Sequence, residues 1–523
     1  MAMRFRHLFT LVPILLTLCT THQAFADGHL NNVKHIIIVM QENHSFDNYF
    51  GALAYAPGSP YHNDGNGCRN GDHKCVDGLT CQVDAAGKFT CSNSNLDDDG
   101  STVFAFHDSR RCVIPDLDHS WGGTHREVNF ANPNNTFFEQ LNDGYVRVND
   151  VTEQPDNGVE SPTEDQTMAF YNQDEIPFYY DLAQKFALSD RYFQSVLGPT
   201  FPNRSYLMAA TSFGHLTTAE IFPPPGGYKP ITGTIFDLLD AHGITWADYF
   251  SDAPQAGSFR QFSIPPKPGD DQHLLPLTAF LAQASAGTLP QVSFVDPSFG
   301  LFGVRFENDE HPPVDIQRGQ AFVSRVLNAV RNGPNWKDSI VFLTYDEHGG
   351  FYDHANPPRA RQGHALEPDG IAPGQCADLS NPLLGSTQPG GGANCTVSRG
   401  DALQLCPEFT PTGAYPAACA NFDQLGVRVP FLAISPFSKS QYVSHTVGDH
   451  TSLLALIEKR FLSSSNENNQ GDEDDQDDAE IPHLTKRDQH ANTLEDLFDF
   501  DGSPSLNTTI GVAQPPAVDC TPH

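Results

Sequence analysis

The sequence predicts an α/β protein with a mainly parallel central sheet flanked by helices and with disulfide-rich loop insertions. Two observations carry this prediction: short apolar runs alternate with amphipathic helical patterns, and cysteines gather in two glycine- and asparagine-rich stretches. Continuous apolar runs are typical of strands buried on both faces, as in parallel sheets. Alternation of such strands with helices is the pattern of α/β folds.

Five segments have the length and composition of buried strands. They are residues 33–40, 244–250, 291–295, 339–345 and 429–434. Helical periodicity is found in residues 234–241, 316–330 and 452–461, and Pro202 suits the first turn of a further helix that runs to Ala210. We therefore expect strands and helices to alternate along most of the chain.

The first 26 residues have the organisation of a secretory signal peptide. Arg4 and Arg6 form a positive region, and residues 8–18 form an apolar stretch too short to span a bilayer. A small-residue motif, Ala24-Phe25-Ala26, follows. We expect cleavage after Ala26 and a secreted or periplasmic mature protein.

Ten of the eleven cysteines lie beyond this leader, and an even number in an exported chain predicts disulfides. They cluster near residues 60–115 and 370–420, where there is little apolar material for a core. We predict pairing within each cluster and leave the connectivity open. A zinc ribbon is the less favoured alternative, because no pair of Cys-x₂-Cys motifs is present. Both stretches are interpreted as insertions in a single domain spanning residues 27–523.

The chain is strongly acidic. Its formal net charge is −34, and loss of Arg4 and Arg6 with the leader takes it to −36. Such a charge argues against nucleic-acid binding and against anchoring to anionic lipid by a basic patch. Residues 463–480 are almost wholly polar and acidic, so we expect a mobile surface segment there, with calcium binding as the less favoured alternative.

Carboxylates and an amide follow two of the predicted strands directly. Glu42 and Asn43 come after the strand at 33–40, and Asp346 and Glu347 come after the strand at 339–345. Ligands of open α/β sheets bind beyond the carboxyl ends of the strands, and buried unpaired carboxylates would be costly. We therefore predict one divalent metal ion at this edge. The oxygen ligands suit several ions; zinc is favoured, with calcium and magnesium as alternatives.

Thr200 stands in the segment Gly198-Pro199-Thr200-Phe201-Pro202-Asn203-Arg204, just before the predicted helix. The N-terminus of a helix favours an anion such as phosphate. A hydroxyl bound to a metal there has a lowered pKa and can attack phosphorus. The local alternative is a plain helix N-cap, since Thr is common in that position.

Histidines supply the remaining candidate groups. His119 and His311 stand among acidic neighbours, and either could bind a phosphoryl oxygen or protonate a leaving group. His354 and Asn203 are weaker candidates for substrate binding. Because the chain has 22 histidines, any one of them is more often structural than catalytic.

Residues 34–51 resemble the opening signature of the bacterial phospholipase C / acid phosphatase A phosphoesterase family, within the alkaline phosphatase-like superfamily. Residues 198–204, 308–312, 344–354 and 449–458 match its later blocks in order, so that the resemblance covers about residues 33–462. The resemblance implies that Thr200 is the nucleophile and that His119 and His311 bind the phosphoryl group or act as acid and base. It implies a metal held by Glu42, Asn43, Thr200, Asp346 and Glu347. One departure is His44, which stands where Arg is common.

The resemblance implies a secreted metal-dependent phosphoesterase that acts through a phosphothreonine. We favour a phospholipase C that hydrolyses phosphatidylcholine-type glycerophospholipids to diacylglycerol and a phosphorylated head group. A broad-specificity acid phosphatase is the alternative. An apolar rim, to which the aromatic clusters at 176–180 and 299–306 could contribute, would distinguish the two.

The expected partners are a phospholipid or phosphate-ester substrate and, transiently, a membrane surface, but no nucleic acid. The alternative from another class is a secreted calcium-binding or adhesion protein, in which Thr200 would have no role.

Overall fold

The computed structural model describes residues 30–65, 67–112, 116–136, 141–151, 164–219, 227–360, 371–376, 395–411, 413–463 and 481–518. The predicted signal peptide and the acidic segment from residue 464 to 480 lie outside these ranges. Among the described residues, no helix has both the length and the apolar character needed to cross a membrane.

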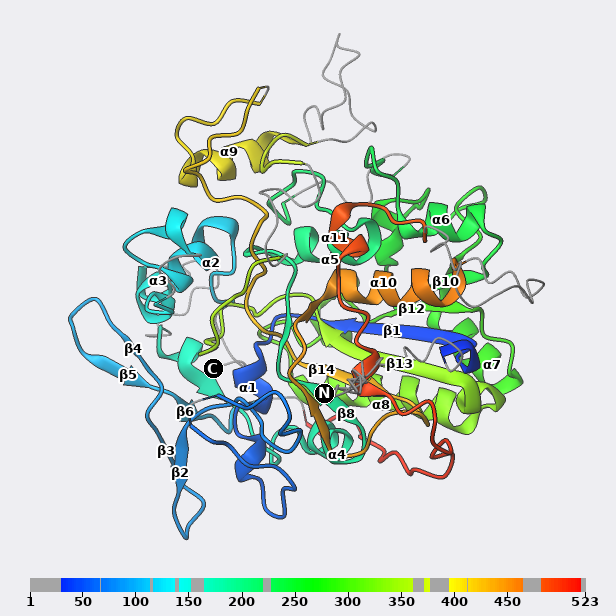
Figure 1. The fold of residues 1–523 in the computed structure, drawn as a ribbon, viewed down its shortest axis with the longest axis horizontal. Helices are drawn as coiled ribbons and strands as arrows, with labels where there is room; N and C mark the ends of the chain where they lie inside the picture. The colour runs from blue at the N-terminus through cyan, green and yellow to red at the C-terminus, as the bar shows by residue number, and fades with distance from the viewer. Residues whose placement is uncertain are drawn as a thin grey trace, which may run out of the picture.

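An eight-stranded sheet forms the centre of the molecule (Figure 1). Its strands lie in the order β11 (Leu274–Pro276), β10 (Trp246–Phe250), β12 (Val292–Asp296), β1 (His35–Gln41), β13 (Ser339–Tyr345), β14 (Phe431–Ile434), β8 (Ala187–Ser189) and β15 (Tyr442–Ser444). All neighbouring pairs are parallel except the two that β14 makes with β13 and β8. The predicted α/β fold with a mainly parallel sheet is therefore confirmed.

The register between β1 and β13 positions the functional residues. Ile36 lies opposite Ile340, and Gln41 lies opposite Tyr345 at the ends of the two strands. The next residue of each strand is a carboxylate, Glu42 in one case and Asp346 in the other. Because both strands are parallel and end at the same level, the two carboxylates emerge at the same edge of the sheet.

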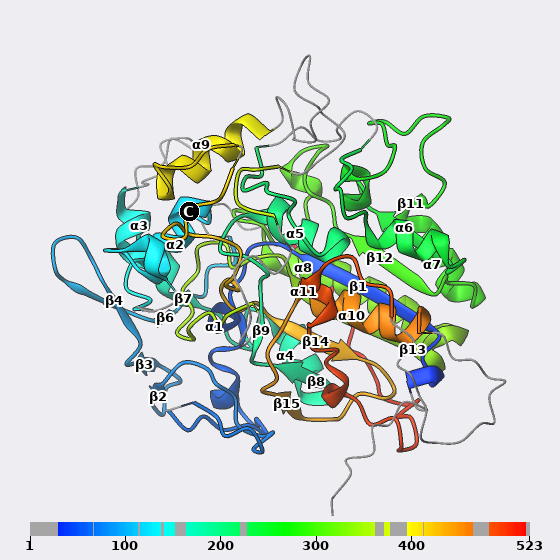
Figure 2. The same ribbon diagram turned by 45° about the horizontal axis from the view of Figure 1, so that its top comes forward.

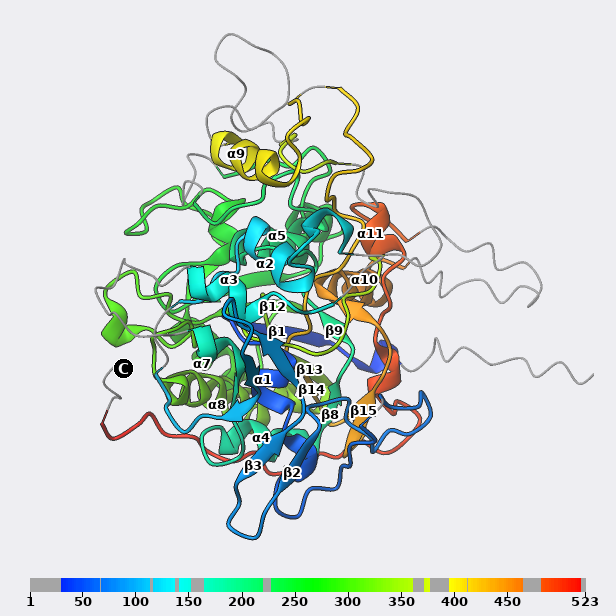
Figure 3. The ribbon, with the colours of Figure 1, turned by 90° about the vertical axis from the view of Figure 1, so that its left-hand side faces the viewer.

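Helices cover both faces of the sheet. The helices of the described residues are α1 (Phe46–Phe50), α2 (Trp121–Val128), α3 (Tyr145–Val151), α4 (Pro177–Lys185), α5 (Thr200–Ala209), α6 (Ile235–Ala241), α7 (Leu277–Ala286), α8 (Ile316–Asn332), α9 (Thr396–Leu405), α10 (His450–Phe461) and α11 (Lys486–Gln489). Figure 3 shows α5, α10 and α11 on one side of the sheet and α4, α7 and α8 on the other. The helices expected at 234–241, 316–330 and 452–461 correspond to α6, α8 and α10.

The core is the sheet and the inward faces of these helices. In α8 the predicted apolar stripe is buried, namely Phe322, Val323, Val326, Leu327 and Val330. The helix begins at Asp315, whose carboxylate accepts a hydrogen bond from the backbone of Gln317, as an N-cap does. The helical spacing of the apolar residues and the Asp315 cap together explain why this segment is the longest helix among the described residues.

Short pairs of strands lie outside the main sheet. They are β2 (Cys81–Val83) with β3 (Phe89–Cys91), β4 (Ser94–Leu96) with β5 (Thr102–Phe104), β6 (Phe106–His107) with β7 (Ala169–Phe170), and β9 (Tyr192–Phe193) with β16 (Gly448–Asp449). The hairpins β2–β3 and β4–β5 project from one side of the molecule (Figure 2).

Disulfides join cysteines within each predicted cluster. The first cluster contains Cys68–Cys75 and Cys81–Cys91, and the second contains Cys376–Cys395 and Cys406–Cys419. Pairing within clusters is thereby confirmed for these four bonds, and Cys112 is disulfide-bonded as well. These pairings leave no zinc-ribbon ligand set among the cysteines concerned.

Candidate active site

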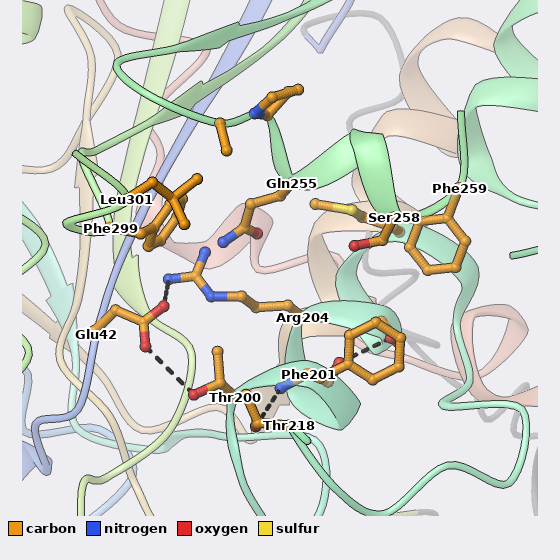
Figure 4. A pocket seen from close by; sticks show the side chains of 14 residues that line it. Glu42, Thr200, Phe201, Arg204, Thr218, Gln255, Ser258, Phe259, Phe299 and Leu301 are labelled. Carbon is orange, nitrogen blue, oxygen red and sulfur yellow. Dashed lines mark hydrogen bonds and ion pairs between the residues drawn. The ribbon is translucent and has the colours of Figure 1, made fainter. Parts of the chain in front are cut away.

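Thr200 is the first residue of α5 and lies among the strand-end carboxylates. The N-cap position is occupied by Pro199, which has no side-chain acceptor to cap the helix, and the Phe201 N–H of the first turn donates to the Thr218 hydroxyl at 3.3 Å. The Thr200 hydroxyl instead donates a hydrogen bond to Glu42 Oε2 at 3.3 Å (Figure 4). The hydroxyl is therefore turned toward the predicted metal ligands and is not used as a helix cap.

Asn203 braces the turn that carries Thr200. It is fully buried, and its amide N–H groups donate to the carbonyls of Gly198 at 2.7 Å and Pro199 at 3.1 Å. Its Oδ1 accepts a hydrogen bond from the backbone N–H of Val196 at 3.0 Å. Both donors of this predicted substrate-binding residue are thus used within the loop, so the geometry gives it a positioning role.

The Asp346 carboxylate joins the ends of β1 and β13 by accepting hydrogen bonds from their backbones. The backbone N–H groups of Asn43 and Glu347 both donate to Asp346 Oδ1, at 3.3 Å and 2.8 Å. Asn43 adopts a left-handed φ of 63°, and the facing Gly349 has a φ of 64°. A Cβ at Gly349 would lie 2.3 Å from the Asn43 carbonyl oxygen, so only glycine permits this approach.

Three buried carboxylates gather at this edge, and two cationic groups face them, the Arg204 guanidinium and the His119 ring. The Arg204 guanidinium reaches Glu42 Oε1 at 2.6 Å and Asp346 Oδ2 at 2.9 Å. Burial raises the pKa of Glu42 well above its ordinary value; Arg204 opposes this shift, whereas the carboxylates of Asp346 and Glu347 add to it. The surplus of negative charge favours a bound cation.

The residues at this edge fit a divalent metal by their donor chemistry. Asn43 Oδ1 and Glu347 Oε1 are buried without a hydrogen-bond partner, which is costly unless something else engages them. Oxygen donors of this kind suit hard or borderline ions. The donors come from Glu42, Asn43, Thr200, Asp346 and Glu347, the five residues predicted to hold the metal.

The carboxylates do not converge fully on one point. Among the described residues, several clusters of acidic groups and histidines bring their ligand atoms within 4.8 Å of one another, but the strand-end carboxylates form none of these. The physical reason is Arg204, whose guanidinium stands between Glu42 and Asp346.

His119 and His311 lie at the rim of the same site and share Asp116. His119 Nε2 is 3.8 Å from Glu347 Oε1, and Asp116 Oδ1 is 3.7 Å from His119 Nδ1 and 3.8 Å from His311 Nε2. Burial alone would lower the pKa of His119, but Glu347 and Asp116 outweigh it and raise the pKa to about 10. The structure thus brings His119 next to a predicted metal ligand, and Asp116 links His311 to it.

His354 belongs to a different cluster. Its Nδ1 lies 2.6 Å from Asp47 Oδ2 and its Nε2 lies 3.2 Å from Asp77 Oδ1. The buried Arg428 also pairs with Asp47, at 3.1 Å, and with Asp353, at 2.8 Å. Neither partner of His354 is among the five predicted ligands, so its contacts are those of a structural ion-pair network.

His44 is neither a metal ligand nor a rim residue. It is buried, with Nδ1 2.7 Å from Asn48 Oδ1 and Nε2 3.1 Å from the Glu310 carbonyl, and it stacks on Tyr49 and Phe351. Burial lowers its pKa to about 3, which keeps the ring neutral. The replacement of a common Arg by His therefore serves packing beneath the site.

Arg204 is the functional side chain that the sequence reasoning left without a role. It follows Thr200 by four residues on α5, a spacing that places two side chains on the same face of a helix. That spacing was the available signal. Its Nη1 is buried without a hydrogen-bond partner, so a donor of the guanidinium remains for an anion.

An apolar cavity of about 210 Å³ opens beside Thr200 (Figure 4). Thr200, Glu42 and Arg204 form its polar end. Its remaining walls are mainly apolar and include Phe201, Met208, Phe259, Phe299 and Leu301. The predicted cluster at 299–306 therefore contributes to this pocket, whereas the cluster at 176–180 is part of the hydrophobic core.

A second, polar pocket of about 420 Å³ lies on the histidine side of Thr200. Asp116, Asp118 and His119 line it, together with Pro199 and Thr218. Thr218 also lines the apolar cavity. The loop that begins α5 thus has an apolar pocket on one side and an acidic pocket on the other.

A hydroxyl at the start of a helix, set among buried oxygen donors at the carboxyl ends of parallel strands, defines a phosphoric ester hydrolase that uses a divalent metal. The chain belongs to the Phosphoesterase family, whose family model matches residues 33–462. The resemblance found in the sequence is thereby confirmed.

Two curated relatives illustrate the family. The chain is 28% identical over 506 residues to "Non-specific phospholipase C6" of Arabidopsis thaliana, covering 95% of this chain and 77% of that protein. It is 28% identical over 515 residues to "Phospholipase C B" of Mycobacterium tuberculosis, covering 91% and 80%. A solved protein of the alkaline phosphatase superfamily from Vibrio parahaemolyticus aligns at 12% identity over 54% of this chain and 60% of that one, with a TM-score of 0.26, which is too low to support an inference.

Proposed function

We propose that this protein is a phospholipase C that hydrolyses phosphatidylcholine-type glycerophospholipids to diacylglycerol and a phosphorylated head group. The observation that carries the proposal is the apolar cavity that adjoins Thr200 and Glu42. A glyceride leaving group needs an apolar wall next to phosphorus, whereas a small phosphomonoester does not. The names of the relatives, phospholipases C from a plant and a bacterium, support the same substrate class.

The proposed reaction has two steps. Thr200 Oγ attacks phosphorus in line, so that a Thr–O–P bond forms while the bond to the glyceride oxygen breaks and diacylglycerol leaves. Water then cleaves the phosphothreonine and releases the phosphorylated head group. The hydrogen bond from Thr200 to Glu42 orients the hydroxyl before attack.

The chain's own residues would hold the phosphoryl group. The free Nη1 of Arg204 is a donor for its oxygens, and the dipole at the start of α5 favours an anion there. His119 and His311 are the groups we assign to phosphoryl binding or to proton transfer to the leaving oxygen. When bound, a divalent metal would lower the pKa of the attacking hydroxyl and stabilise charge on the phosphoryl oxygens.

Two assays on the purified protein test the substrate. We expect release of diacylglycerol from phosphatidylcholine to exceed release of p-nitrophenol from p-nitrophenyl phosphate. Strong activity on the second substrate alone would assign the protein as an acid phosphatase. Thr200→Ala should abolish turnover and Thr200→Ser should retain part of it, because only the second keeps a nucleophilic oxygen. A calcium-binding or adhesion protein would instead tolerate Thr200→Ala.

The metal and the destination of the protein are part of the same proposal. We propose one zinc ion per chain, with calcium and magnesium as the alternatives, and elemental analysis of the purified protein identifies it. We further propose export, with cleavage after Ala26. Amino-terminal sequencing of protein recovered from the periplasm or the medium should start at Asp27, and a retained Met1 would contradict this proposal.

A further inference from the structure

The loop at residues 299–306 exposes a run of large apolar side chains. The exposed fraction is 47% for Leu301, 62% for Phe302, 68% for Val304 and 52% for Phe306. Within the part of the chain that the structure describes, no other stretch of this length exposes as many. Apolar patches of this kind on a soluble protein mark interaction sites, whereas isolated exposed residues do not.

The backbone of this loop is held in place. The Asp252 carboxylate accepts hydrogen bonds from the backbone N–H groups of Phe299 at 3.1 Å and Leu301 at 3.0 Å. The Gly303 N–H donates to the Gly300 carbonyl at 2.7 Å, which closes a tight turn. Arg318 Nη1 donates to the Val304 carbonyl at 3.0 Å. These hydrogen bonds fix the backbone of the loop, and the fixed backbone holds the apolar side chains in their exposed positions.

The loop is continuous with the catalytic pocket. Phe299 and Leu301 line the apolar cavity that Thr200 and Glu42 close at its polar end (Figure 4). Leu301 is at the same time half exposed to solvent. An apolar surface thus runs from the outside of the protein, along one short loop, to the nucleophile.

Charge selects the partner for this surface. The chain carries a formal charge of −34, so an anionic surface would repel it. The single basic residue of the loop is Arg305, whose guanidinium lies over the Phe306 ring at 4.5 Å. The loop must therefore bind by burying its apolar side chains in an apolar medium whose surface has no net charge. A zwitterionic phospholipid bilayer offers both.

We propose that loop 299–306 is an interfacial lipid-binding element that inserts Phe302, Val304 and Phe306 into the surface of a zwitterionic phospholipid bilayer. It brings the mouth of the apolar cavity to the lipid, so that a substrate molecule reaches Thr200 without crossing water. This inference rests on the proposed phospholipase C function, since a phosphomonoesterase would not need a lipid surface.

The first experiment compares two double variants that remove similar exposed surface. Phe302→Ser with Val304→Ser alters the loop without touching the residues that line the cavity. Phe104→Ser with Val512→Ser is the matched control, because these side chains are 53% and 68% exposed elsewhere on the protein. Binding to phosphatidylcholine vesicles is measured by co-sedimentation, with Thr200→Ala present in every protein to prevent hydrolysis.

We expect the loop variant to bind vesicles roughly tenfold more weakly for each apolar side chain removed, and the control to bind like the parent. Phosphatidylserine in the vesicles should not strengthen binding. With Thr200 restored, the loop variant should hydrolyse vesicles slowly but hydrolyse dihexanoyl phosphatidylcholine below its micellar concentration at the normal rate. This second rate also shows that the variant is folded.

A gain-of-signal variant provides an independent measurement. Val304→Trp places a fluorophore in the loop, while the native Trp121, Trp246 and Trp336 are buried at 2%, 3% and 4% exposure. Its emission should shift to the blue when phosphatidylcholine vesicles are added, because the indole enters an apolar medium. An unchanged spectrum would contradict the proposal.

The outcomes separate this inference from the proposed function. Equal vesicle binding by the loop variant and its control would overturn the inference, even if phosphatidylcholine is hydrolysed. A dimer that the loop variant converts to monomer, with no vesicle binding, would mean that a second copy of the chain covers the loop and would also overturn it. Loop-dependent vesicle binding without any phospholipid hydrolysis would instead remove the proposed activity and leave the lipid-binding loop standing.

Discussion

Asn203→Ala removes three hydrogen bonds from the turn that carries Thr200. The amide donates to the carbonyls of Gly198 and Pro199 and accepts from the N–H of Val196, and all three bonds lie in a fully buried site. A lost bond costs about 0.5–1.5 kcal/mol, and a buried N–H left without an acceptor costs about 1–3 kcal/mol. We therefore expect the free energy of unfolding to fall by about 3–5 kcal/mol.

The same change should slow turnover. Because the three bonds hold the segment from which Thr200 projects, their loss displaces the nucleophile, and a displacement of about 1 Å costs roughly a hundredfold in rate. We expect kcat to fall by about that factor while KM changes little. Urea denaturation gives the stability, and steady-state kinetics with a lipid substrate separate kcat from KM.

Two further variants sharpen the test. Asn203→Asp keeps an acceptor for Val196 but turns a carboxylate toward two carbonyl oxygens, so it should destabilise at least as much as the Ala variant. Asn132→Ala, at an exposed position whose side chain makes no capping bond, is the matched control and should be silent. A raised KM for Asn203→Ala with unchanged stability would refute the positioning role and favour direct contact with substrate.

Three other predictions follow from the buried charges. Glu347→Gln should weaken metal binding by at least about a hundredfold and abolish turnover, which elemental analysis and kinetics check together. Arg428→Met leaves the buried carboxylate of Asp353 without its cation and Asp47 with His354 as its remaining partner, so the free energy of unfolding in urea should fall by roughly 3–5 kcal/mol. Burial raises the pKa of Glu310 from 4.5 to about 7, so the stability that this carboxyl contributes is complete below about pH 4.5 and is lost as the pH rises through 7. Glu310→Gln should remove this component of the pH dependence, roughly 3 kcal/mol, and an unchanged slope would contradict it.

Elements with a strong local pattern were predictable. The strands at 33–40 and 339–345 consist mainly of apolar residues and coincide with β1 and β13 within a residue or two. The helix at 316–330 has both its apolar stripe and its cap in the sequence, and α8 follows it. In these segments propensity, periodicity and burial favour the same structure, so that little depends on distant residues.

Other elements were not predictable, for physical reasons. β8, β11 and β15 are only three residues long, and they are strands because neighbouring strands of the sheet supply their hydrogen bonds. The direction of β14, antiparallel to β13 and β8, depends on the path of a long connection and leaves no mark on the strand's own composition. The periodicity of a single short segment does not encode its partner.

Within the site, the sequence pattern was enough to place some side chains, whereas the roles of others depended on tertiary contacts. Placing Glu42 and Asp346 at one edge needed only the rule that parallel strands end together. The roles of Asn203 and His354 needed their partners, which lie in the Thr200 loop and beside Arg428. A polar residue's function depends on where its donors and acceptors are used, and those partners are remote in sequence.

The sequence by itself determined the fold class, the family and the disulfide clusters, because each leaves a local pattern of residue types. Only the tertiary structure decided which side chains pair. It placed Arg204 between the carboxylates, turned the Thr200 hydroxyl toward Glu42, and joined the exposed loop 299–306 to an apolar cavity beside Thr200. These are contacts between segments far apart along the chain, and their energies depend on distances that exist only once the chain has folded.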